Sequence, residues 1–509
     1  MGLSTRQPAG VSRKSPWLPC SSHQQTLLQR ACRTRAPTAA ANSGRRSLLV
    51  RAEAPPPPPP PFLGASGAPE PAPIAGAKAA SRTSPSAAVP AAHPGQGYSS
   101  AILLQGFAWD SYIHGKGDCV SKEGYMPSQL YDLTSKYGNE QQLRDLNTAL
   151  TAAGITPMAD IVINHRCADE QVRGVYNSYK DEIRHRGASI DWGRWAITSN
   201  DPRFQGTGNP DTGADYGPAP DLDHANPELR AALRDWLTWL QHDIGFGGWR
   251  FDYVRGFGAE FVAEYIDATS GPDSLNVGEY WTEAQWNGPH LSYDQNGPRQ
   301  QLCDWINGTH QRCCAFDFPT KSILQEAVRN CEYDRLRDGQ GKAPGLLGWW
   351  PGKAVTFVDN HDTGSTQQHW PFPAGRVGLG YAYVLSHPGI PCLFWDHVFG
   401  GGWGEGLHRD IASLAALRRR CGLEADSGIS IAAAERDLYV ARVEGRFGSL
   451  TLKLGPRFEM GSLLPAAADG WTLAAAGDDW AVWERPATNA AAAAAAASAS
   501  AQRQDALEQ

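Results

Sequence analysis

Polar residues that can do acid–base or nucleophilic chemistry stand at the ends of four short apolar segments of the chain. They are Asn164-His165, Arg250 with Asp252, Glu279, and the run Asp359-Asn360-His361-Asp362. Two or three carboxylates that meet at one place are what cleavage of a glycosidic bond requires. One protonates the leaving oxygen, and another attacks or shields the oxocarbenium-like carbon. A single Asp or Glu is more often a surface or ion-pair residue, so this interpretation depends on the convergence of the four segments.

The segment that carries Arg250 and Asp252 indicates how such a carboxylate would be prepared. Residues two apart in a strand point to the same face of the sheet, so the two side chains would be neighbours. An adjacent guanidinium favours the ionised form of a carboxyl group. We therefore expect Asp252 to be ionised and available as a nucleophile.

Strands alternate with amphipathic helices from Ser100 onward, which is the pattern of an α/β protein with a (β/α) barrel. The clearest helix runs from Pro227 to about His242, because Asn226 is a natural N-cap and apolar residues recur on one face. Chemistry in such a barrel lies at the carboxyl ends of the strands. The segments with the composition of strands are Ile102–Phe107, Met158–Ile163, Gly248–Tyr253, Leu275–Trp281, Ala315–Phe318, Val355–Val358 and Cys392–Trp395.

Three further regions depart from this alternation. Residues 166–225 form a long irregular insertion that is rich in Gly, Asp, Asn and Arg, and its many oxygen ligands suit calcium. Residues 425–486 contain short apolar segments separated by turns and predict an antiparallel β-sheet domain. The catalytic barrel would then span residues 98–424, insertion included. The Ala-rich tail over 487–509 predicts disorder.

The first 97 residues have a composition of their own. Residues 1–52 contain no Asp or Glu but eight Arg, which is typical of an organelle transit peptide and indicates the chloroplast. The seven Pro of residues 55–61 and the Ala/Pro/Ser stretch after them predict a stiff, disordered linker. Disorder without any targeting role is the alternative.

Composition excludes several classes of protein. The net charge of −7 argues against nucleic acid as the main partner. No apolar run reaches the roughly 20 residues of a membrane-spanning helix. The ten Cys are irregularly spaced, and Cys313-Cys314 lie in an apolar run, so buried free thiols in a reducing compartment are expected. The 18 Trp would suit a surface for sugar rings, although core packing is their commoner use.

Four motifs, in order, resemble the signature regions of the α-amylase family of glycoside hydrolases. They are Asp160-Ile-Val-Ile-Asn-His165, Gly248-Trp-Arg-Phe-Asp252, Gly278-Glu-Tyr-Trp281 and Phe357-Val-Asp-Asn-His-Asp362. Further segments resemble plant and green-algal members, namely Glu123-Gly-Tyr-Met-Pro127, Gly208-Asn-Pro-Asp-Thr-Gly-Ala-Asp215, Gly348-Trp-Trp350 and Thr363-Gly-Ser-Thr366. The resemblance covers about residues 101–485. It implies retaining endo-hydrolysis of α-1,4-glucosidic bonds in starch and malto-oligosaccharides.

The resemblance also implies roles for individual residues. Asp252 would be the nucleophile, Glu279 the acid/base, and Asp362 the group that stabilises the transition state. The implied substrate-binding residues are Tyr125, His165, Arg250, Arg255, His361, Trp281, Trp349 and Trp350. Trp349-Trp350 resemble a platform that binds starch away from the active site in cereal members; core packing is the alternative. Phe458 stands where some relatives carry a Tyr in a second surface site.

Calcium is the implied cofactor. The side chains of Asn164, Asp211 and Asp221 match ligands of the main site, together with backbone oxygens of Ala214 and Gly256. Asp215 and Asp201 match a second site that shares Asp221. Hard oxygen donors from separate segments suit calcium rather than zinc, although an Asp in a Gly-rich loop is commonly a turn residue. A third site is matched only by Glu182 and Asp191, because His185 and Gly187 stand where ligands are expected.

Two departures from the family pattern stand out. About 15 residues separate Phe107 from Glu123, whereas one βα unit of such a barrel takes about 30. We therefore expect a (β/α)8-type barrel that lacks one βα unit, the first helix and second strand, and has two unpaired edges. A lost exon, a tolerated seven-stranded barrel, or a catalytically impaired relative that only binds glucan would each explain this. Arg255 stands where α-amylases usually carry Lys, which changes hydrogen-bond geometry.

We expect an active, monomeric starch hydrolase that needs neither nucleic acid nor a membrane. The alternatives are a glucan-binding protein without turnover and an enzyme that transfers glucan chains.

Overall fold

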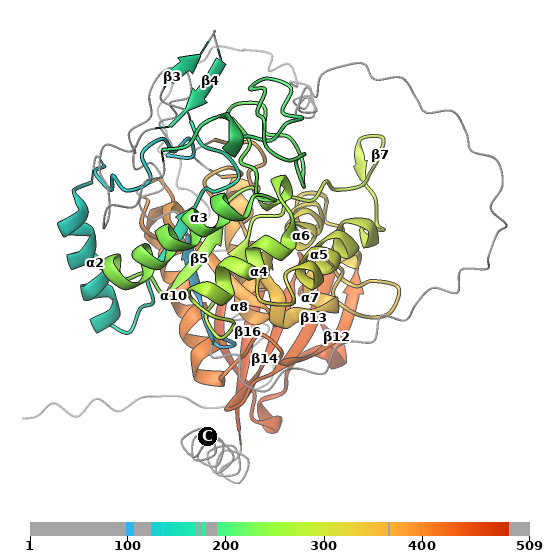
Figure 1. Cartoon of the computed structure of the whole chain (residues 1–509). Coiled ribbons are helices and arrows are strands. Elements are labelled where there is room, and N and C mark those ends of the chain that lie inside the picture. Colours follow the sequence, from blue (N-terminus) through green and yellow to red (C-terminus); the bar gives the residue numbers. More distant parts are fainter. Residues whose placement is uncertain are drawn as a thin grey trace, which may run out of the picture.

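The computed structural model describes residues 98–105, 124–135, 137–167, 170–172, 175–179, 191–364, 367–400 and 402–487. The predicted transit peptide and linker (1–97) lie outside these residues, as does the predicted tail beyond its first residue. In the described part, no helix combines the length and apolarity that crossing a membrane would require. Figure 1 shows a helix-covered sheet with a second sheet at one end and an irregular insertion at the other.

The core of the larger unit is a parallel sheet of seven strands. They are β1 (Leu103–Gln105), β2 (Met158–Ile161), β5 (Gly248–Phe251), β6 (Val277–Gly278), β9 (Cys314–Phe316), β10 (Ala354–Phe357) and β11 (Ile390–Phe394). Every residue of β5, β9 and β10 is buried, as expected of parallel strands covered on both faces. All seven predicted strands are therefore confirmed, although their bounds differ by a few residues from the predicted ones.

The order of these strands is that of a barrel wall. From β2 to β11 neighbours follow the chain, and β1 then pairs with β11. Among the described residues, β1 and β2 are the edges, and no strand pairs with the other side of either. The connection over residues 106–123 lies outside the described part, so the loss of one βα unit stays a prediction.

Helices cover this sheet. They are α2 (Glu140–Ala152), α3 (Pro227–Trp239), α4 (Ala259–Ala268), α5 (Asn296–Gly308), α6 (Phe318–Asn330), α7 (Leu346–Trp349), α8 (Val377–Ser386), α9 (Trp395–Phe399) and α10 (Gly404–Cys421). The predicted helix from Pro227 is confirmed: Asn226 accepts a hydrogen bond from the Glu228 N–H at 2.9 Å, and a π-helical turn (Leu240–Ile244) ends at left-handed Gly245.

Asp317 fixes two helices at once. Its buried carboxylate accepts hydrogen bonds from the N–H and hydroxyl of Thr320, in the first turn of α6, at 2.9 and 2.7 Å. It also accepts the N–H groups of Leu346 and Leu347, at the start of α7, at 3.0 and 2.8 Å. The short helix α7, which carries Trp349, is thereby tied to the end of β9.

Two smaller sheets and a domain complete the fold. The insertion contains the hairpin β3 (Glu170–Val172) and β4 (Val175–Ser178), and the β6–α5 connection contains β7 (Trp286–Asn287) and β8 (His290–Leu291). The C-terminal sheet is antiparallel, as predicted, in the order β12-β13-β14-β16-β15, and packs on α8 and α10. Its strands are β12 (Gly428–Glu435), β13 (Leu438–Glu444), β14 (Gly448–Leu454), β15 (Thr472–Gly477) and β16 (Trp480–Pro486). The described Cys are all free thiols, and Cys313 and Cys314 are buried as expected.

Replacing Asp317 with Ala should lower the free energy of unfolding by roughly 2–4 kcal/mol, because buried donors at the starts of α6 and α7 lose their acceptor. Urea denaturation followed by circular dichroism measures this. The matched control is Asp304→Ala on the exposed side of α5, for which a change under about 0.5 kcal/mol is expected. Equal effects of the two substitutions would contradict the stabilisation of both α6 and α7 by Asp317.

Candidate active site

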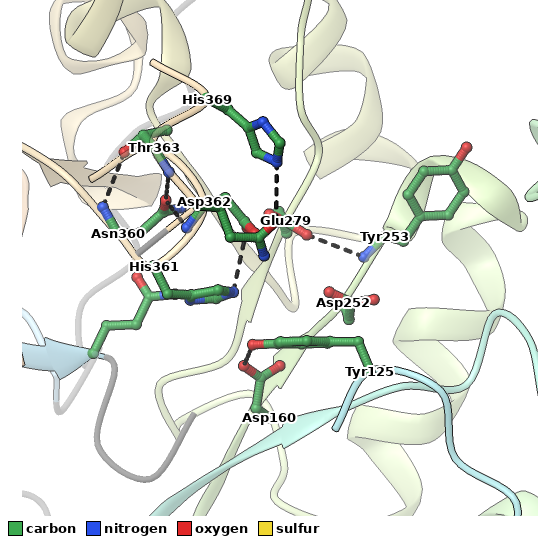
Figure 2. A network of polar contacts seen from close by, with 12 residues as sticks. Tyr125, Asp160, Asp252, Tyr253, Glu279, Asn360, His361, Asp362, Thr363 and His369 are labelled. Atoms are coloured by element: carbon green, nitrogen blue, oxygen red, sulfur yellow. Dashed lines mark hydrogen bonds and ion pairs between the residues drawn. The ribbon is translucent and has the colours of Figure 1, made fainter. Parts of the chain in front are cut away.

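The ends of neighbouring parallel strands bring the predicted catalytic residues together. The strand register pairs Asp160 with Arg250 and Phe251 with Gly278, so Asp252 and Glu279 leave their strands at the same edge of the sheet. Asp362 follows β10 at that edge. Figure 2 shows Asp252, Glu279 and Asp362 grouped in one place, with Tyr125 beside them. Three of the four segments singled out in the sequence thus converge, and His165 of the fourth lies 2.9 Å from the Tyr125 carbonyl.

Arg250 is the only cation in direct contact with these carboxylates among the described ion pairs. Its Nη1 lies 2.7 Å from Oδ1 of Asp252 and 2.7 Å from Oδ1 of Asp160, and its Nη2 lies 3.0 Å from Oε2 of Glu279. The Arg250 side chain is 5 % exposed. One buried guanidinium therefore holds three carboxylates within hydrogen-bond distance, including the predicted pairing with Asp252.

Glu279 is the carboxyl group best prepared to hold a proton. Burial raises its pKa well above the ordinary value, the charges of Asp252 and Asp362 add to this, and Arg250 opposes them. Burial raises the pKa of Asp362 to about 6, with the same opposition from Arg250 and reinforcement from Asp252. A carboxyl group that keeps its proton near neutral pH is suited to general acid catalysis.

Asp160 belongs to the same group of side chains. Its Oδ2 accepts a hydrogen bond from the Tyr125 hydroxyl at 2.6 Å while its Oδ1 contacts Arg250. The Tyr125 ring stacks on His361 with centroids 5.2 Å apart and planes 10° apart, and the Arg250 guanidinium lies 5.5 Å from the same ring. The sequence analysis assigned no role to Asp160. The feature that points to it is the strand register, in which Asp160 lies directly opposite Arg250 on the neighbouring strand.

A tight turn after β10 presents His361 and Asp362. The Asn360 side-chain oxygen accepts the N–H groups of Asp362 and Thr363 at 3.0 and 2.8 Å. Behind it, buried Asp359 contacts the ammonium of Lys321 at 3.1 Å. Gln367 donates to Oδ1 of Asp362 at 2.8 Å. These side chains position the predicted site residues. The sequence analysis named Asn360 only as part of the run 359–362 and did not name Lys321 or Gln367.

Both predicted histidines are buried and neutral at pH 7. Burial and the charge of Arg250 lower the pKa of His361 to about 3. Burial lowers the pKa of His165 to about 4, its Nε2 lies 2.9 Å from the Tyr125 carbonyl, and its ring stacks on Tyr216 at 3.9 Å. They can offer hydrogen bonds to an uncharged ligand without introducing a further cation.

The remaining predicted binding residues occupy two places. Arg255 donates from Nη1 to the Trp281 carbonyl at 3.1 Å, and the Trp281 ring stacks on Phe318 at 4.7 Å, so these residues are linked to the end of β6. Trp349 and Trp350 are partly exposed at α7, where Trp350 packs against the core and Trp349 lies over the Arg299 guanidinium. Phe458 is partly buried in the C-terminal domain, with the Lys453 ammonium 4.9 Å from its ring centre.

The insertion contains a group of three aspartates that lie close together. Carboxylate oxygens of Asp201, Asp215 and Asp221 all lie within 4.8 Å of one another. The pKa of Asp221 is raised to about 8, mainly by burial, and the charges of Asp211, Asp201 and Asp215 add to this. Such mutual repulsion is relieved by a bound cation.

The other predicted metal ligands border this group. Asn164 donates to Asp221 at 3.0 Å, and its own Oδ1 is buried without a hydrogen-bond partner. A Cβ added at Gly256 would come within 1.8 Å of that oxygen, and the Ala214 N–H bonds the Arg255 carbonyl at 2.9 Å. The unsatisfied oxygen, the acidic group and the two backbone segments fit a hard cation with oxygen ligands.

Tyr253 connects the acidic group to the carboxylates around Arg250. Its backbone, in the left-handed region with φ 45°, directs its N–H toward Oε2 of Glu279 at 3.4 Å, and its hydroxyl donates to the Asp215 carbonyl at 3.1 Å. For the third predicted metal site, Glu182, His185 and Gly187 lie outside the described residues, whereas Asp191 is described and exposed.

Comparison with known proteins agrees with this fold. The family "Alpha amylase, catalytic domain" matches residues 117–301, and "Alpha-amylase C-terminal beta-sheet domain" matches residues 420–484. "Probable alpha-amylase 2" of Arabidopsis thaliana is 41% identical over 409 residues, which cover 75% of this chain and 94% of that protein. "Alpha-amylase 3, chloroplastic" of the same plant is 39% identical over 77% of this chain, which spans only 45% of its length.

A solved structure extends the comparison to the fold. A cyclomaltodextrin glucanotransferase with a three-domain arrangement superposes with a TM-score of 0.54 and 16% identity over 76% of this chain and 87% of its own. The parallel barrel sheet joined to an antiparallel C-terminal sheet places the chain in the class of (β/α)-barrel proteins that carry a C-terminal β-sheet domain. The chain belongs to the α-amylase family.

Replacing Glu279 with Gln should stabilise the fold, and by more at higher pH. Because the pKa of Glu279 is raised from 4.5 in the fold, the folded state keeps a proton that the unfolded chain has released. The free energy of unfolding of the wild type therefore falls as pH rises above that value, by up to about 1.4 kcal/mol per pH unit. The Gln variant lacks this dependence.

Urea unfolding of both proteins at pH 5.0 and pH 7.5 tests the expectation. The stabilising effect should be larger at pH 7.5. The control is Glu283→Gln, whose side chain is 88% exposed and should show no such pH dependence. A constant difference between wild type and Glu279→Gln would mean that the pKa of Glu279 is not raised.

Proposed function

We propose that this protein hydrolyses internal α-1,4-glucosidic bonds of starch and related glucans. The observation that carries the proposal is the convergence of Asp252, Glu279 and Asp362, with Arg250 in contact with the first two. Similarity to plant proteins named as α-amylases supports the substrate class. Because the chain spans less than half of one of these relatives, activity and substrate are proposals for this chain.

Asp252 would be the nucleophile and Glu279 the acid/base of a double displacement. Arg250 contacts both carboxylates, which keeps them close together, as a retaining mechanism requires. The proton held by Glu279 would pass to the leaving glycosidic oxygen while Asp252 bonds to the anomeric carbon. Glu279, then ionised, would take a proton from the water that releases the sugar. Asp362, fixed by Gln367 and the Asn360 turn, would bind sugar hydroxyls.

The neighbouring side chains would hold the sugar rings. Tyr125 offers a flat face whose tilt is set by Asp160 and His361. His165 and His361 would hydrogen-bond hydroxyls as neutral imidazoles, because burial lowers both pKa values. Trp281 and Arg255 would contact the glucan chain beyond the cleaved bond. Trp349 and Trp350, partly exposed at α7, would bind glucan away from the active site.

Reducing-end release and loss of viscosity from soluble starch by the full chain test this function. Glu279→Gln should lower the rate by about 10²–10⁴-fold, because proton transfer to the leaving group is lost. Glu283→Gln, on the same connection but exposed, should retain wild-type rates. Binding to starch granules without release of reducing ends would instead identify a non-catalytic glucan-binding protein. Products longer than the substrate would identify chain transfer.

We further propose calcium as the cofactor, held by Asn164, Asp211 and Asp221 with backbone oxygens of Ala214 and Gly256, and at a second position by Asp215, Asp201 and Asp221. The oxygen-only donor set supports calcium over zinc. When bound, calcium supplies positive charge that offsets the carboxylate repulsion. Asp221 and Asn164 would hold the insertion against the end of β2, and Tyr253 would transmit that position to Glu279.

Calcium should raise the thermal midpoint relative to a chelated sample, with a stabilisation of about 2.7 kcal/mol at one hundred times the dissociation constant. Asp221→Asn should lose most of the calcium-dependent shift, whereas Asp273→Asn, exposed before β6, should keep it. Magnesium should give a smaller shift because it demands a tighter octahedral site. If calcium does not change the thermal midpoint of the wild-type protein, calcium is not its cofactor.

We propose a plastid location and a monomeric state for the same protein. The acid-free, Arg-rich start of the chain supports the location, together with the similarity to a relative named as chloroplastic. No nucleic-acid or membrane partner is proposed, in keeping with the net charge of −7.

A further inference from the structure

Tyr293 is exposed although nothing in the proposed reaction uses it. With 59 % of its surface accessible, it is the most exposed large hydrophobic side chain in the described part of the molecule. It lies between the hairpin β7–β8 and the start of α5, on the connection that follows the strand bearing Glu279. Single exposed aromatic side chains are ordinary, so its surroundings decide whether it has a role.

The ring of Tyr293 is held from behind and at its edge. The Arg335 guanidinium lies 3.8 Å from the ring centre and covers one face. Arg335 is itself buried, and it contacts Glu332 at 2.6 Å and donates to the Leu291 carbonyl at 2.9 Å. The Tyr293 hydroxyl donates to Asp334 at 3.0 Å. With one face covered and the tilt fixed, the exposed surface is largely the opposite face of the ring.

Trp349 is built in the same way. The guanidinium of Arg299 lies 3.9 Å from its ring, and Arg299 is buried and contacts Asp338 at 3.0 Å and the Ala343 carbonyl at 3.1 Å. One segment supports both rings, since residues 334 and 335 hold Tyr293 and residue 338 holds Arg299. Figure 1 shows α5 lying between the β7 hairpin and α7, and α5 contacts α7.

We propose that Tyr293 is a sugar-stacking position of a glucan-binding surface outside the active site, and that it engages the same α-glucan chain as Trp349. The proposal rests on the proposed function for its substrate class. A pyranose ring presents an apolar face of C–H groups that fits a flat aromatic face. Because both rings are already fixed by buried guanidinium groups, stacking costs little conformational entropy.

The surroundings favour a glucan over a protein partner. A protein interface needs a contiguous, partly apolar patch of several hundred Å². Here the described contacts of the ring are with polar and charged side chains, namely Asp334 and Arg335, the latter paired with Glu332. A long chain that reaches two such rings gains affinity by multivalency, since the second contact becomes intramolecular once the first has formed.

Sedimentation of the full-length protein with insoluble starch granules tests the proposal without requiring turnover. Tyr293→Ala should weaken granule binding by about 2- to 10-fold, as expected for the loss of one aromatic contact. Tyr293→Phe, which keeps the ring and loses only the hydroxyl, should bind granules nearly as the wild type does. The control is Tyr137→Ala, which removes an aromatic side chain of similar exposure, 56 %, from the segment before α2.

A double variant, in which Tyr293 and Trp349 are both replaced with Ala, tests whether the two rings bind the same glucan chain. If they do, Tyr293→Ala should weaken binding less when Trp349 is already Ala than when it is present, because the multivalent gain is gone. Wild-type granule binding by Tyr293→Ala, with an unchanged thermal midpoint, would overturn the proposal. A protein that binds granules through Tyr293 but releases no reducing ends would refute the proposed hydrolysis and leave this surface intact.

Discussion

The buried guanidinium of Arg250 is the interaction on which the site depends. Asp160, Asp252 and Glu279 all contact it, and Asp362 lies in the same electrostatic environment. Without that cation, so many acidic groups could not share a small, poorly hydrated volume with any of them ionised. With it, one carboxylate can carry a negative charge while Glu279 keeps a proton, which separates the two roles that glycoside cleavage needs.

The fold supplies this arrangement through strand register rather than through long flexible loops. Asp160 and Arg250 are partners in adjacent strands, and Asp252 and Glu279 come directly after β5 and β6. Loops and turns outside the strands hold the site residues in position. Asp317, Asp359 and Asn360 fix helix starts and the turn before Asp362, and Tyr253 joins Glu279 to the insertion. Sites built on rigid elements keep their geometry more closely than sites on loops.

Much of this could be predicted because periodicity and strand-end position are visible in a single sequence. All seven barrel strands, the helix from Pro227 and the convergence of Asp252, Glu279 and Asp362 follow from such patterns. Contacts between side chains distant in sequence do not. The pairing of Asp160 with Tyr125, the burial of Lys321 against Asp359 and the support of Tyr293 by Arg335 depend on how helices and loops pack. No periodicity of the sequence predicts these contacts.

The pairing of β1 with β11 has a consequence for synthesis of the protein. Leu103 lies opposite Cys392, about 290 residues later in the chain, and β1 has no other strand partner among the described residues. After β1 leaves the ribosome, it must therefore wait for nearly the whole catalytic region before it can pair. Contacts of such high sequence separation slow folding and leave unpaired edges exposed meanwhile. Chaperone dependence during translation is the expected cost of this topology.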